Sequence, residues 1–243
     1  MPVWHDDVRF FDVFRGNECI ASFFLDPFAR PGQKRGGAWM NPMVSRSGSL
    51  GHDGQARRPV AVMVCNQTPP VDGLPSLMSF REVETLFHEF GHGLHHMLTT
   101  VDERFVAGIN GVEWDAVELP SMWMEGWCTH RPTLNRMARH YETGAPMPDE
   151  MLAQLIASRT FRAATGLRGQ LGWTTLDLAL HGGAPPADPV AVQEEVLGRC
   201  WQGRSMKGDL WICSFHHIFG GAAYAAGYYS YCLLYTSDAA DSG

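Results

Sequence analysis

The sequence predicts a mostly α-helical chain with a small β-sheet near its N-terminus, an α+β fold. β-rich stretches bounded by turn residues occur only before residue 67, whereas apolar residues beyond residue 79 recur mostly at the spacings of three and four that build one face of a helix. No internal repeat or low-complexity block interrupts this order. With 243 residues, the chain can bury one sizeable core or two small ones.

Composition and charge argue against several classes of partner. The chain has 19 basic and 26 acidic residues, and its net charge of −7 argues against nucleic acid or an anionic membrane surface. No apolar run reaches the length that a bilayer span requires, and the first residues lack the basic and apolar regions of a secretory signal. Six cysteines without a C-x-x-C pair are typical of reduced thiols, so we expect a cytoplasmic protein.

The strands are expected before residue 67. Residues 8–26 hold two apolar runs around residues 15–17, which predicts a β-hairpin. Residues 27–58 are rich in Gly, Pro, Ser and Arg, and we expect them to be irregular. Residues 59–66 are β-rich and predict a buried or an edge strand. This strand is a candidate to pair with an extended peptide, although a core strand is the ordinary alternative.

Residues 79–98 are expected to form the central helix. Ser79 is followed three residues later by Glu82, which indicates a capping box in which each side chain satisfies a backbone N–H at the helix start. Apolar residues then recur on one side of the helix and predict a buried stripe. The stripe consists of Val83, Phe87, Phe90, Leu94 and Met97.

A different face of this helix carries a metal-binding pattern. His88 and His92 are four residues apart, so both imidazoles can point at one metal ion, and Glu89 lies beside that point. This is the H-E-x-x-H pattern, in which the histidines hold zinc and the glutamate takes a proton from the water that zinc activates. The alternative is a histidine pair that only forms a polar face. Gly91 and Gly93 weaken a helix, so we expect another backbone to pack closely against them.

A third ligand has to come from elsewhere in the chain. His95 lies about 10 Å along the helix axis from the first histidine of the motif, too far to share one tetrahedral ion, and we expect it and His96 to be solvated or to support the ligands. Glu118 belongs to the next acidic cluster. It either partners a helix cap at Asp115 or holds zinc, in which case Glu125 or Asp115 orients an imidazole. Spacing alone leaves both interpretations open.

The sequence predicts that the chain after residue 98 is mostly helical. Apolar spacing and turn residues divide it into segments. We expect a loop over residues 99–115, a helix to about Tyr141, a helix over residues 149–181 that breaks at Gly166, Gly169 or Gly172, a loop over residues 182–189, and a helix from about Val190.

Several segments together resemble the thimet oligopeptidase and oligopeptidase A family of zinc metallopeptidases. They are FHEFGHGLHHML, WDAVELPS and MEGWC at the motif, FFLDPFARPGQKRGGAW, RPVAVMVCN and TPP before it, and SFHHIF and AAYAAGYYSY after it. The resemblance covers residues 3–231 and implies a zincin-like catalytic region with one zinc ion per chain. The third ligand of the family is the glutamate of its second motif, which is Glu118 here.

The resemblance also assigns residues near the C-terminus. Tyr224, Tyr228 and Tyr231 are spaced by four and three, which predicts one helical face, and packing is the ordinary reason for such a stripe. The family, however, has a histidine, a glycine-rich turn and a tyrosine helix that faces zinc. By resemblance, His217, Tyr224 and Tyr231 are donors to the substrate and the oxyanion, and Tyr228 lines the cleft. The stretch FGGAAY holds one residue more than the family pattern.

The resemblance implies a zinc-dependent endopeptidase that hydrolyses short, unstructured peptides with Glu89 as general base. The alternatives are a zinc carboxypeptidase and a truncated, inactive chain that only binds peptide. The family has a long helical region before this segment, so we expect residues 1–231 to be part of a catalytic domain. Residues 232–243 do not resemble the family, and we expect them to be foreign or disordered.

Overall fold

The chain consists of two compact units. The computed structural model describes residues 1–52, 54–201, 207–220 and 224–232. The first unit is Met1–Val112 with Leu119–Leu152, and the second is Glu113–Glu118 with Ala153–Gly243. Within the described ranges, no helix is both long enough and apolar enough to cross a membrane. The predicted tail, residues 232–243, lies outside the described residues except for Cys232.

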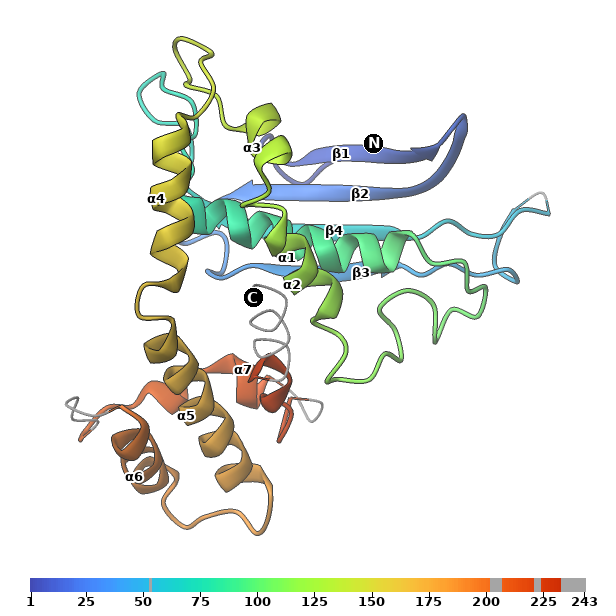
Figure 1. The fold of residues 1–243 in the computed structure, drawn as a ribbon. Coiled ribbons are helices and arrows are strands. Elements are labelled where there is room, and N and C mark those ends of the chain that lie inside the picture. The colour runs from blue at the N-terminus through green and yellow to red at the C-terminus, as the bar shows by residue number, and fades with distance from the viewer. Residues whose placement is uncertain (53, 202–206, 221–223, 233–243) are drawn as a thin grey trace. The chain divides into compact units, whose positions relative to one another are not determined.

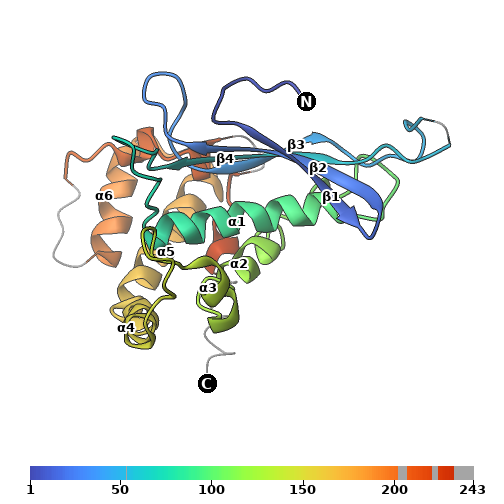
Figure 2. The ribbon, with the colours of Figure 1, turned by 90° about the horizontal axis from the view of Figure 1, so that it is seen from above.

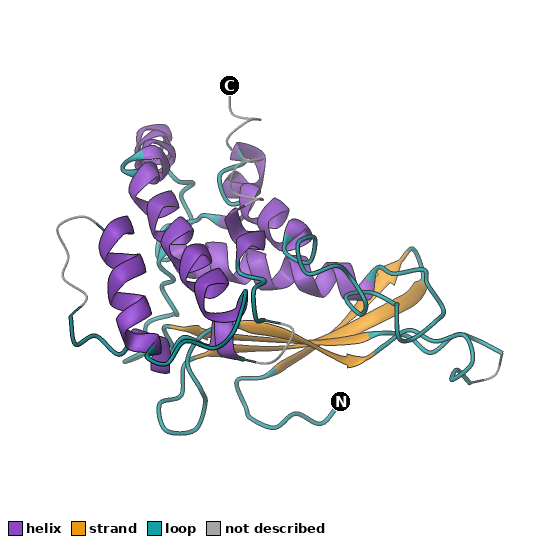
Figure 3. Ribbon diagram, turned by 90° about the horizontal axis from the view of Figure 1, so that it is seen from below, coloured by secondary structure: helices purple, strands orange, loops and turns teal. Residues whose placement is uncertain are grey.

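The first unit contains a four-stranded sheet, drawn as one layer in Figure 3. Its strands are β1 (Arg9–Arg15), β2 (Glu18–Phe28), β3 (Trp39–Val44) and β4 (Val60–Gln67), in the spatial order β1-β2-β4-β3. β1 and β2 form the predicted antiparallel hairpin, and Gly16 at its turn has a φ of 61°, which glycine adopts without steric cost. β4 runs parallel to β2 and antiparallel to β3.

Two expectations about this sheet are wrong. Residues 27–58 are not irregular throughout, because they contain β3. Pro42 hides this strand in the sequence, but β3 lies at an edge of the sheet, where the missing N–H of a proline is tolerated. β4 has hydrogen-bonded neighbours on both sides, so it has no open edge for an extended peptide. The ordinary alternative, a core strand, is confirmed.

The predicted central helix is α1 (Phe80–Met97), which runs along one face of the sheet (Figure 2). Among the strands, it packs chiefly against β4. Phe90, Leu94 and Met97 of the predicted stripe form a core with Ala21 and Ala61 of the sheet. The two alanines are fully buried, and their small side chains let the helix approach the strands. The apolar stripe therefore determines which face of α1 meets the sheet.

The predicted capping box fixes the start of α1. Ser79 Oγ accepts the N–H of Glu82 at 3.3 Å, and the Glu82 carboxylate accepts the N–H of Ser79 at 2.7 Å. The same carboxylate accepts the N–H of Thr68 at 2.7 Å. Burial alone would raise the pKa of Glu82, but the backbone hydrogen bonds from Ser79 and Thr68 lower it. The linker after β4 is thus attached to the first turn of the helix.

The glycines of α1 allow a second helix to lie against it. α2 (Leu119–Gly126) packs on α1, and a Cβ added at Gly91 would lie 2.4 Å from the Pro120 carbonyl oxygen and 2.5 Å from Ser121 Cα. The expected close approach of another backbone is therefore confirmed at Gly91. At Gly93 the close neighbour is a side chain, because the added Cβ would lie 3.0 Å from Met63 Sδ.

The expectation of one helix up to about Tyr141 is wrong. α2 and α3 (Arg131–Met137) are separate helices with a turn at residues 127–129. Pro132 lies in the first turn of α3. In a continuous helix its ring would clash with the carbonyl of residue 128, so the chain must start a new helix before it.

The second unit has its own core, built around α5 (Ala163–His181) and α6 (Pro189–Cys200), which lie side by side (Figure 1). α6 confirms the helix expected from about Val190, and Asp188 caps it by accepting the N–H of Ala191. A 3-10 helix, Trp211–Cys213, and α7 (His216–Phe219) follow. The buried core residues are Trp173, Leu176, Leu180, Leu197, Ile212, Ile218 and Tyr228.

The helix expected over residues 149–181 breaks, but not at a glycine. α4 (Asp149–Thr160) ends before α5 begins, and Arg162 between them has a left-handed φ of 57°. Gly172 remains inside α5 because Leu197 and Cys200 of α6 pack against it. The glycine is thus used for helix packing.

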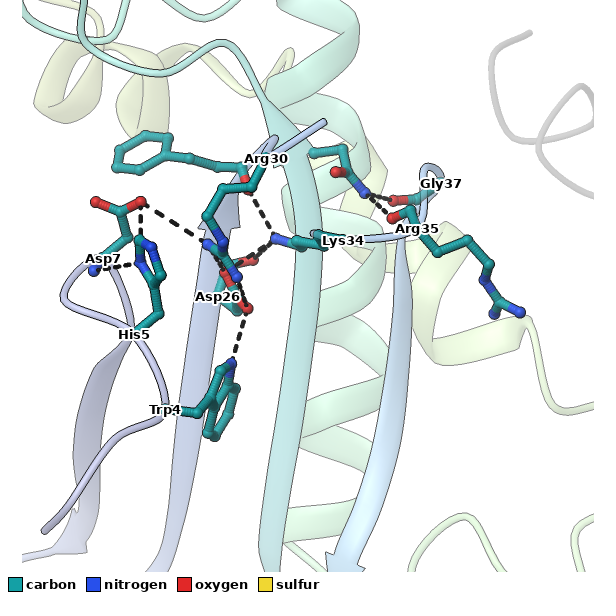
Figure 4. Close-up of polar contacts among 10 residues, drawn as sticks. Trp4, His5, Asp7, Asp26, Arg30, Lys34, Arg35 and Gly37 are labelled. Carbon is teal, nitrogen blue, oxygen red and sulfur yellow. Dashed lines mark hydrogen bonds and ion pairs between the residues drawn. The ribbon is translucent and has the colours of Figure 1, made fainter. Parts of the chain in front are cut away.

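A buried charged cluster holds the loop after β2 (Figure 4). The Asp26 side chain is 4% exposed, and its carboxylate accepts two hydrogen bonds from Arg30, both at 2.7 Å. It also accepts hydrogen bonds from Lys34 at 2.9 Å and from the Trp4 indole at 3.0 Å. Burial alone would raise the pKa of this carboxyl, but the hydrogen bonds from Arg30, Lys34 and Trp4 lower it to about 2. The cluster ties the N-terminal segment to the loop that leads to β3.

The packing at Gly91 predicts the effect of one methyl group. Gly91→Ala forces the α2 backbone away from α1 and should lower the free energy of unfolding by about 1 to 3 kcal/mol. Gly126→Ala is the matched control, because no atom lies within 4 Å of its added Cβ and it should cost nothing. Urea unfolding measures both. Equal stability of Gly91→Ala and the parent would contradict the close approach.

The Asp26 cluster predicts a pH-dependent contribution to stability. Because the pKa of Asp26 is lowered to about 2 from 3.8, its stabilising effect is complete above its unfolded pKa and is lost as the pH falls through about 2. Asp26→Asn should therefore lower the free energy of unfolding by about 2 to 3 kcal/mol at pH 7, and the deficit should shrink below about pH 4.

The matched control for this variant is Asp12→Asn, because Asp12 is exposed and its carboxylate accepts the hydroxyl of Ser22. Urea unfolding at pH 7 and pH 3 compares the variants. A deficit of the same size at both pH values would rule out ionisation of Asp26 as its cause.

Candidate metal centre

α1 and the residue that precedes α2 together form a possible metal site. His88 and His92 lie one turn apart on α1, with ring centroids 5.0 Å apart. Glu118 is joined by a peptide bond to Leu119, the first residue of α2, and α2 packs on α1 at Gly91. His88, His92 and Glu118 each offer one ligand atom, and these atoms lie within 4.8 Å of one another. Two imidazoles and a carboxylate at such separations can converge on one divalent ion.

The position of Glu118 separates two interpretations of the acidic cluster. α2 begins at Leu119, after Glu118, so Glu118 is not the third residue of a helix capped by Asp115. The capping explanation is therefore wrong. Glu118 is 7% exposed, and a buried carboxylate requires polar or charged partners.

Glu125 on α2 orients one of the two imidazoles. Its Oε1 lies 2.6 Å from Nδ1 of His88. A carboxylate only accepts, so Nδ1 donates this hydrogen bond, and Nε2 is the ring nitrogen that would bind a metal ion. Glu125 thus lies where we expected a carboxylate that orients an imidazole if Glu118 holds zinc.

Glu89 follows His88 directly and is 5% exposed. It acts electrostatically on Cys65, a buried residue of the neighbouring strand β4. Burial, and then the charge of Glu89, raises the pKa of the Cys65 thiol to about 12, so this thiol stays protonated at neutral pH. All six cysteines lie among the described residues, and none of them forms a disulfide.

The two histidines at the end of α1 have different surroundings, and only His96 departs from the expectation. His96 is not solvated, since it is fully buried and its Nε2 lies 2.9 Å from the Val44 carbonyl oxygen of β3. Burial lowers its pKa, although the hydrogen bond to Val44 opposes this. His95 is partly buried and lines a cavity of about 510 Å³ with Leu94 and Trp123. His96 therefore attaches α1 to the edge strand of the sheet.

In the second unit, two of the candidate donors lie close to Glu118. The hydroxyl of Tyr231 donates to Glu118 Oε1 at 3.1 Å. Burial, and then the charge of Glu118, raises the pKa of Tyr231 well above its usual value. The ring of His217 lies 6.2 Å from the ring of Tyr231, and burial lowers the pKa of His217 against the opposing charge of Glu118.

Tyr224 and Tyr228 do not share a helical face with Tyr231, so that expectation is wrong. Residues 224–228 form a turn in which Ala226 has a φ of 58°, and helical geometry begins only at residue 229. The left-handed residue interrupts the helical path that the spacing predicted. The extra residue of FGGAAY involves residues 221–223, which lie outside the described ranges.

The two tyrosines of this turn have different surroundings. The ring of Tyr224 lies edge-on to Trp114, with centroids 4.7 Å apart. Tyr228 is 7% exposed, belongs to the core of the second unit, and donates from its hydroxyl to Gln170 Oε1 at 2.8 Å. A role of Tyr228 at the substrate stays a prediction.

Sequence reasoning missed the residues that support this turn. A Cβ added at Gly227 would lie 2.4 Å from Cδ1 of Trp114, so Trp114 packs directly on the backbone of the turn. Asp177 of α5 accepts the N–H groups of Ala226 and Tyr228. Two signals for them in the sequence are weak. Asp177 is an acidic residue in an otherwise apolar stretch of helix, and Trp114 stands beside an acidic cluster.

Comparison with known proteins gives a consistent family match. The family model described as "Peptidase family M3" matches residues 1–240. The chain is 54% identical over 236 residues to organellar oligopeptidase A, chloroplastic/mitochondrial, of Arabidopsis thaliana. It is 45% identical over 235 residues to oligopeptidase A of Escherichia coli (strain K12), and 38% identical over 251 residues to the dipeptidyl carboxypeptidase of the same strain.

The alignment with the Arabidopsis protein covers 95% of this chain and 30% of that relative. The alignment with oligopeptidase A of Escherichia coli covers 95% of this chain and 34% of the relative, and the alignment with the dipeptidyl carboxypeptidase covers 100% and 35%. The chain therefore spans about a third of the length of the curated relatives that it matches.

The Glu125 hydrogen bond predicts a change in metal affinity. Glu125→Ala leaves the His88 ring without its orienting carboxylate and should weaken binding of a divalent ion by roughly 10- to 100-fold. Glu113→Ala, in the same acidic stretch but exposed, is the matched control and should bind as the parent does. Titration with Co²⁺, followed by its absorption, measures both affinities. Unchanged affinity of Glu125→Ala would show that His88 needs no such partner.

Proposed function

This chain belongs to peptidase family M3, and from that premise we propose that it carries the zinc-binding part of an endopeptidase that hydrolyses short, unstructured peptides. The observation that carries the proposal is the grouping of His88, His92 and Glu118 within 4.8 Å. The relatives that are 45% to 54% identical to this chain are named oligopeptidase A, which supports the proposed substrate class.

The donor set fits a catalytic zinc ion. Two imidazole nitrogens and one carboxylate oxygen are ligands that zinc prefers, and three protein ligands leave a further position open, as catalytic zinc sites require. The Nδ1 of His88 is engaged by Glu125, which supports ligation through Nε2. Zinc bound here would lower the pKa of a water molecule and polarise the carbonyl of the scissile bond.

Glu89 is the proposed general base. It is next to His88 in the chain and 5% exposed, so its carboxylate works in a site with little competing solvent. Glu89 takes a proton from the water whose oxygen attacks the scissile carbonyl carbon. It then passes that proton to the leaving nitrogen as the carbon–nitrogen bond breaks. The products are a carboxylic acid and an amine, and Glu89 returns to its starting state.

The proposed donors to the oxyanion are Tyr231, His217 and Tyr224. The hydrogen bond from Tyr231 to Glu118 supports a position of this phenol next to a metal ligand. The ring of His217 lies beside it at 6.2 Å. A fixed donor to the developing oxyanion contributes about 3 kcal/mol to transition-state stabilisation. Tyr228 is proposed to line the cleft through its ring, which lies 5.0 Å from that of Tyr231.

A carboxypeptidase is the second candidate function. It is favoured by the relatives that are 36% and 38% identical to this chain and are named dipeptidyl carboxypeptidase. A peptide with an amidated C-terminus separates the two functions. An endopeptidase cleaves it internally, whereas a carboxypeptidase requires the free terminal carboxylate.

A cytoplasmic location is proposed as well. None of the six cysteines, all of which are described, forms a disulfide, which suits a reducing compartment. One relative, 51% identical, is named probable cytosolic oligopeptidase A, and another, 54% identical, is named as an organellar protein.

Replacing the general base tests the proposed reaction. Glu89→Gln keeps the size of the side chain but cannot accept the proton, so hydrolysis of an internally quenched peptide should fall by roughly 10²- to 10⁴-fold. Zinc content should stay at one ion per chain. Glu103→Gln, an exposed glutamate outside the site, is the matched control.

Two outcomes would contradict the proposal. If Glu89→Gln binds zinc and is as active as the parent, the assigned base is wrong. If the parent binds zinc and peptide but does not hydrolyse the peptide, the chain is the inactive, peptide-binding alternative.

A further inference from the structure

Asp177 is a buried carboxylate at the centre of the second unit that the proposed reaction does not use. Its side chain is 0% exposed. A carboxylate without solvent needs hydrogen-bond donors from the protein. The donors here are the backbone N–H of Ala226, at 3.0 Å from Oδ1, the backbone N–H of Tyr228, at 2.9 Å from Oδ2, and Nδ1 of His181, at 2.7 Å from Oδ1. Asp177 thus binds the main chain of the turn at residues 224–228.

This turn has a backbone that its residues do not favour by themselves. Ala226 has a φ of 58°, in the left-handed region that L-residues rarely adopt. Gly227 has no room for a side chain, because Trp114 lies 2.4 Å from the position of its Cβ. Such a conformation persists where its surroundings hold it. Asp177 accepts the N–H groups on both sides of Gly227, so it is the group best placed to hold this conformation.

The turn controls where two tyrosines lie. Tyr228 ends it and is attached to α5 a second time, through its hydrogen bond to Gln170. Tyr231 lies three residues further on, packs against Tyr228 with ring centroids 5.0 Å apart, and donates to Glu118. The backbone position of Tyr228 therefore sets the position of the phenol that reaches Glu118.

The partner of Asp177 extends this support to a second segment. The ring of His181 lies edge-on to Phe219, with centroids 5.3 Å apart. Phe219 is the last residue of α7, the short helix that carries His217. The Asp177 and His181 pair thus contacts both segments that hold candidate donors.

We propose that Asp177 is a positioning residue for the reaction. Its carboxylate holds the turn at residues 224–228 so that Tyr231 lies at Glu118. Its partner His181 supports the segment of His217 through the contact with Phe219. This inference rests on the proposed function, because Tyr231 and His217 act on the oxyanion only if the chain hydrolyses peptides. Asp177 itself touches neither substrate nor metal.

The variant Asp177→Asn removes the anchoring with little change of volume. The two backbone N–H groups of the turn bind different oxygens of Asp177. An asparagine has one acceptor oxygen and an NH₂ group that only donates, so one of the two N–H groups loses its acceptor. Asp188→Asn is the matched control, because Asp188 is also an aspartate that accepts a backbone N–H in this unit, at the start of α6. An asparagine caps a helix nearly as well as an aspartate.

Amide hydrogen exchange tests the anchoring without any assay of activity. In the zinc-loaded chain, the amides of Ala226 and Tyr228 should be protected in the parent and in Asp188→Asn. In Asp177→Asn at least one of the two should exchange at least about tenfold faster, because the NH₂ group that replaces one carboxylate oxygen cannot accept its N–H. Unchanged exchange in Asp177→Asn would overturn the proposal.

A double-mutant cycle tests the positioning role. Asp177→Asn should lower kcat/KM by up to about a hundredfold, mainly through kcat, with zinc content unchanged. Because Asp177 acts through Tyr231, adding Tyr231→Phe to Asp177→Asn should cause little further loss, so the two effects should be far from additive. Additive effects, or a loss only in KM, would overturn the role.

The remaining outcomes are also decisive. If Asp177→Asn does not fold, His181→Gln is used in a cycle with His217→Asn. The proposal has His181 act through the segment of His217, so additivity of these two effects overturns it. If the parent has no hydrolysis that depends on Glu89, the proposed function has failed and with it the positioning role. The exchange measurement then still decides whether Asp177 holds the turn.

Discussion

The approach of the α2 backbone to Gly91 is the constraint on which the candidate metal centre depends. A helix that carries two histidines on one face needs a third ligand from another part of the chain, and that part must come within reach of the imidazoles. Only a residue without a side chain lets the Pro120 carbonyl oxygen lie 2.4 Å from the position that a Cβ would occupy. Glu118 lies two residues before Pro120, and Glu125 lies five residues after it. One glycine thus permits the placement of both a candidate ligand and the carboxylate that contacts His88.

Much of the first unit could be predicted from the sequence because its signals are local. The capping box of Ser79 and Glu82 and the apolar stripe of α1 depend on residues three and four apart, which are adjacent in a helix. The hairpin of β1 and β2 is likewise encoded by two apolar runs and a glycine turn. The H-E-x-x-H pattern belongs to the same class, since the helix alone brings His88 and His92 together.

The features that were missed depend on contacts between distant residues. β3 pairs with β4 despite Pro42, and the break at Arg162 falls where no glycine marks it. The turn before Tyr228 depends on Asp177, which is 51 residues away in the chain. Spacing between tyrosines carries no information about such a partner. Glu118 is intermediate, since spacing left its role open and only the resemblance to a family favoured it as a ligand.

The edge position of β3 has a consequence for solubility. An edge strand exposes backbone hydrogen-bonding groups that can recruit a strand from another molecule, and uncontrolled recruitment of this kind leads to aggregation. Pro42 removes one of these donors from the middle of β3. In a chain proposed to handle extended peptides, such a proline would act as a gatekeeper that discourages fibril-like stacking along the open side of the sheet.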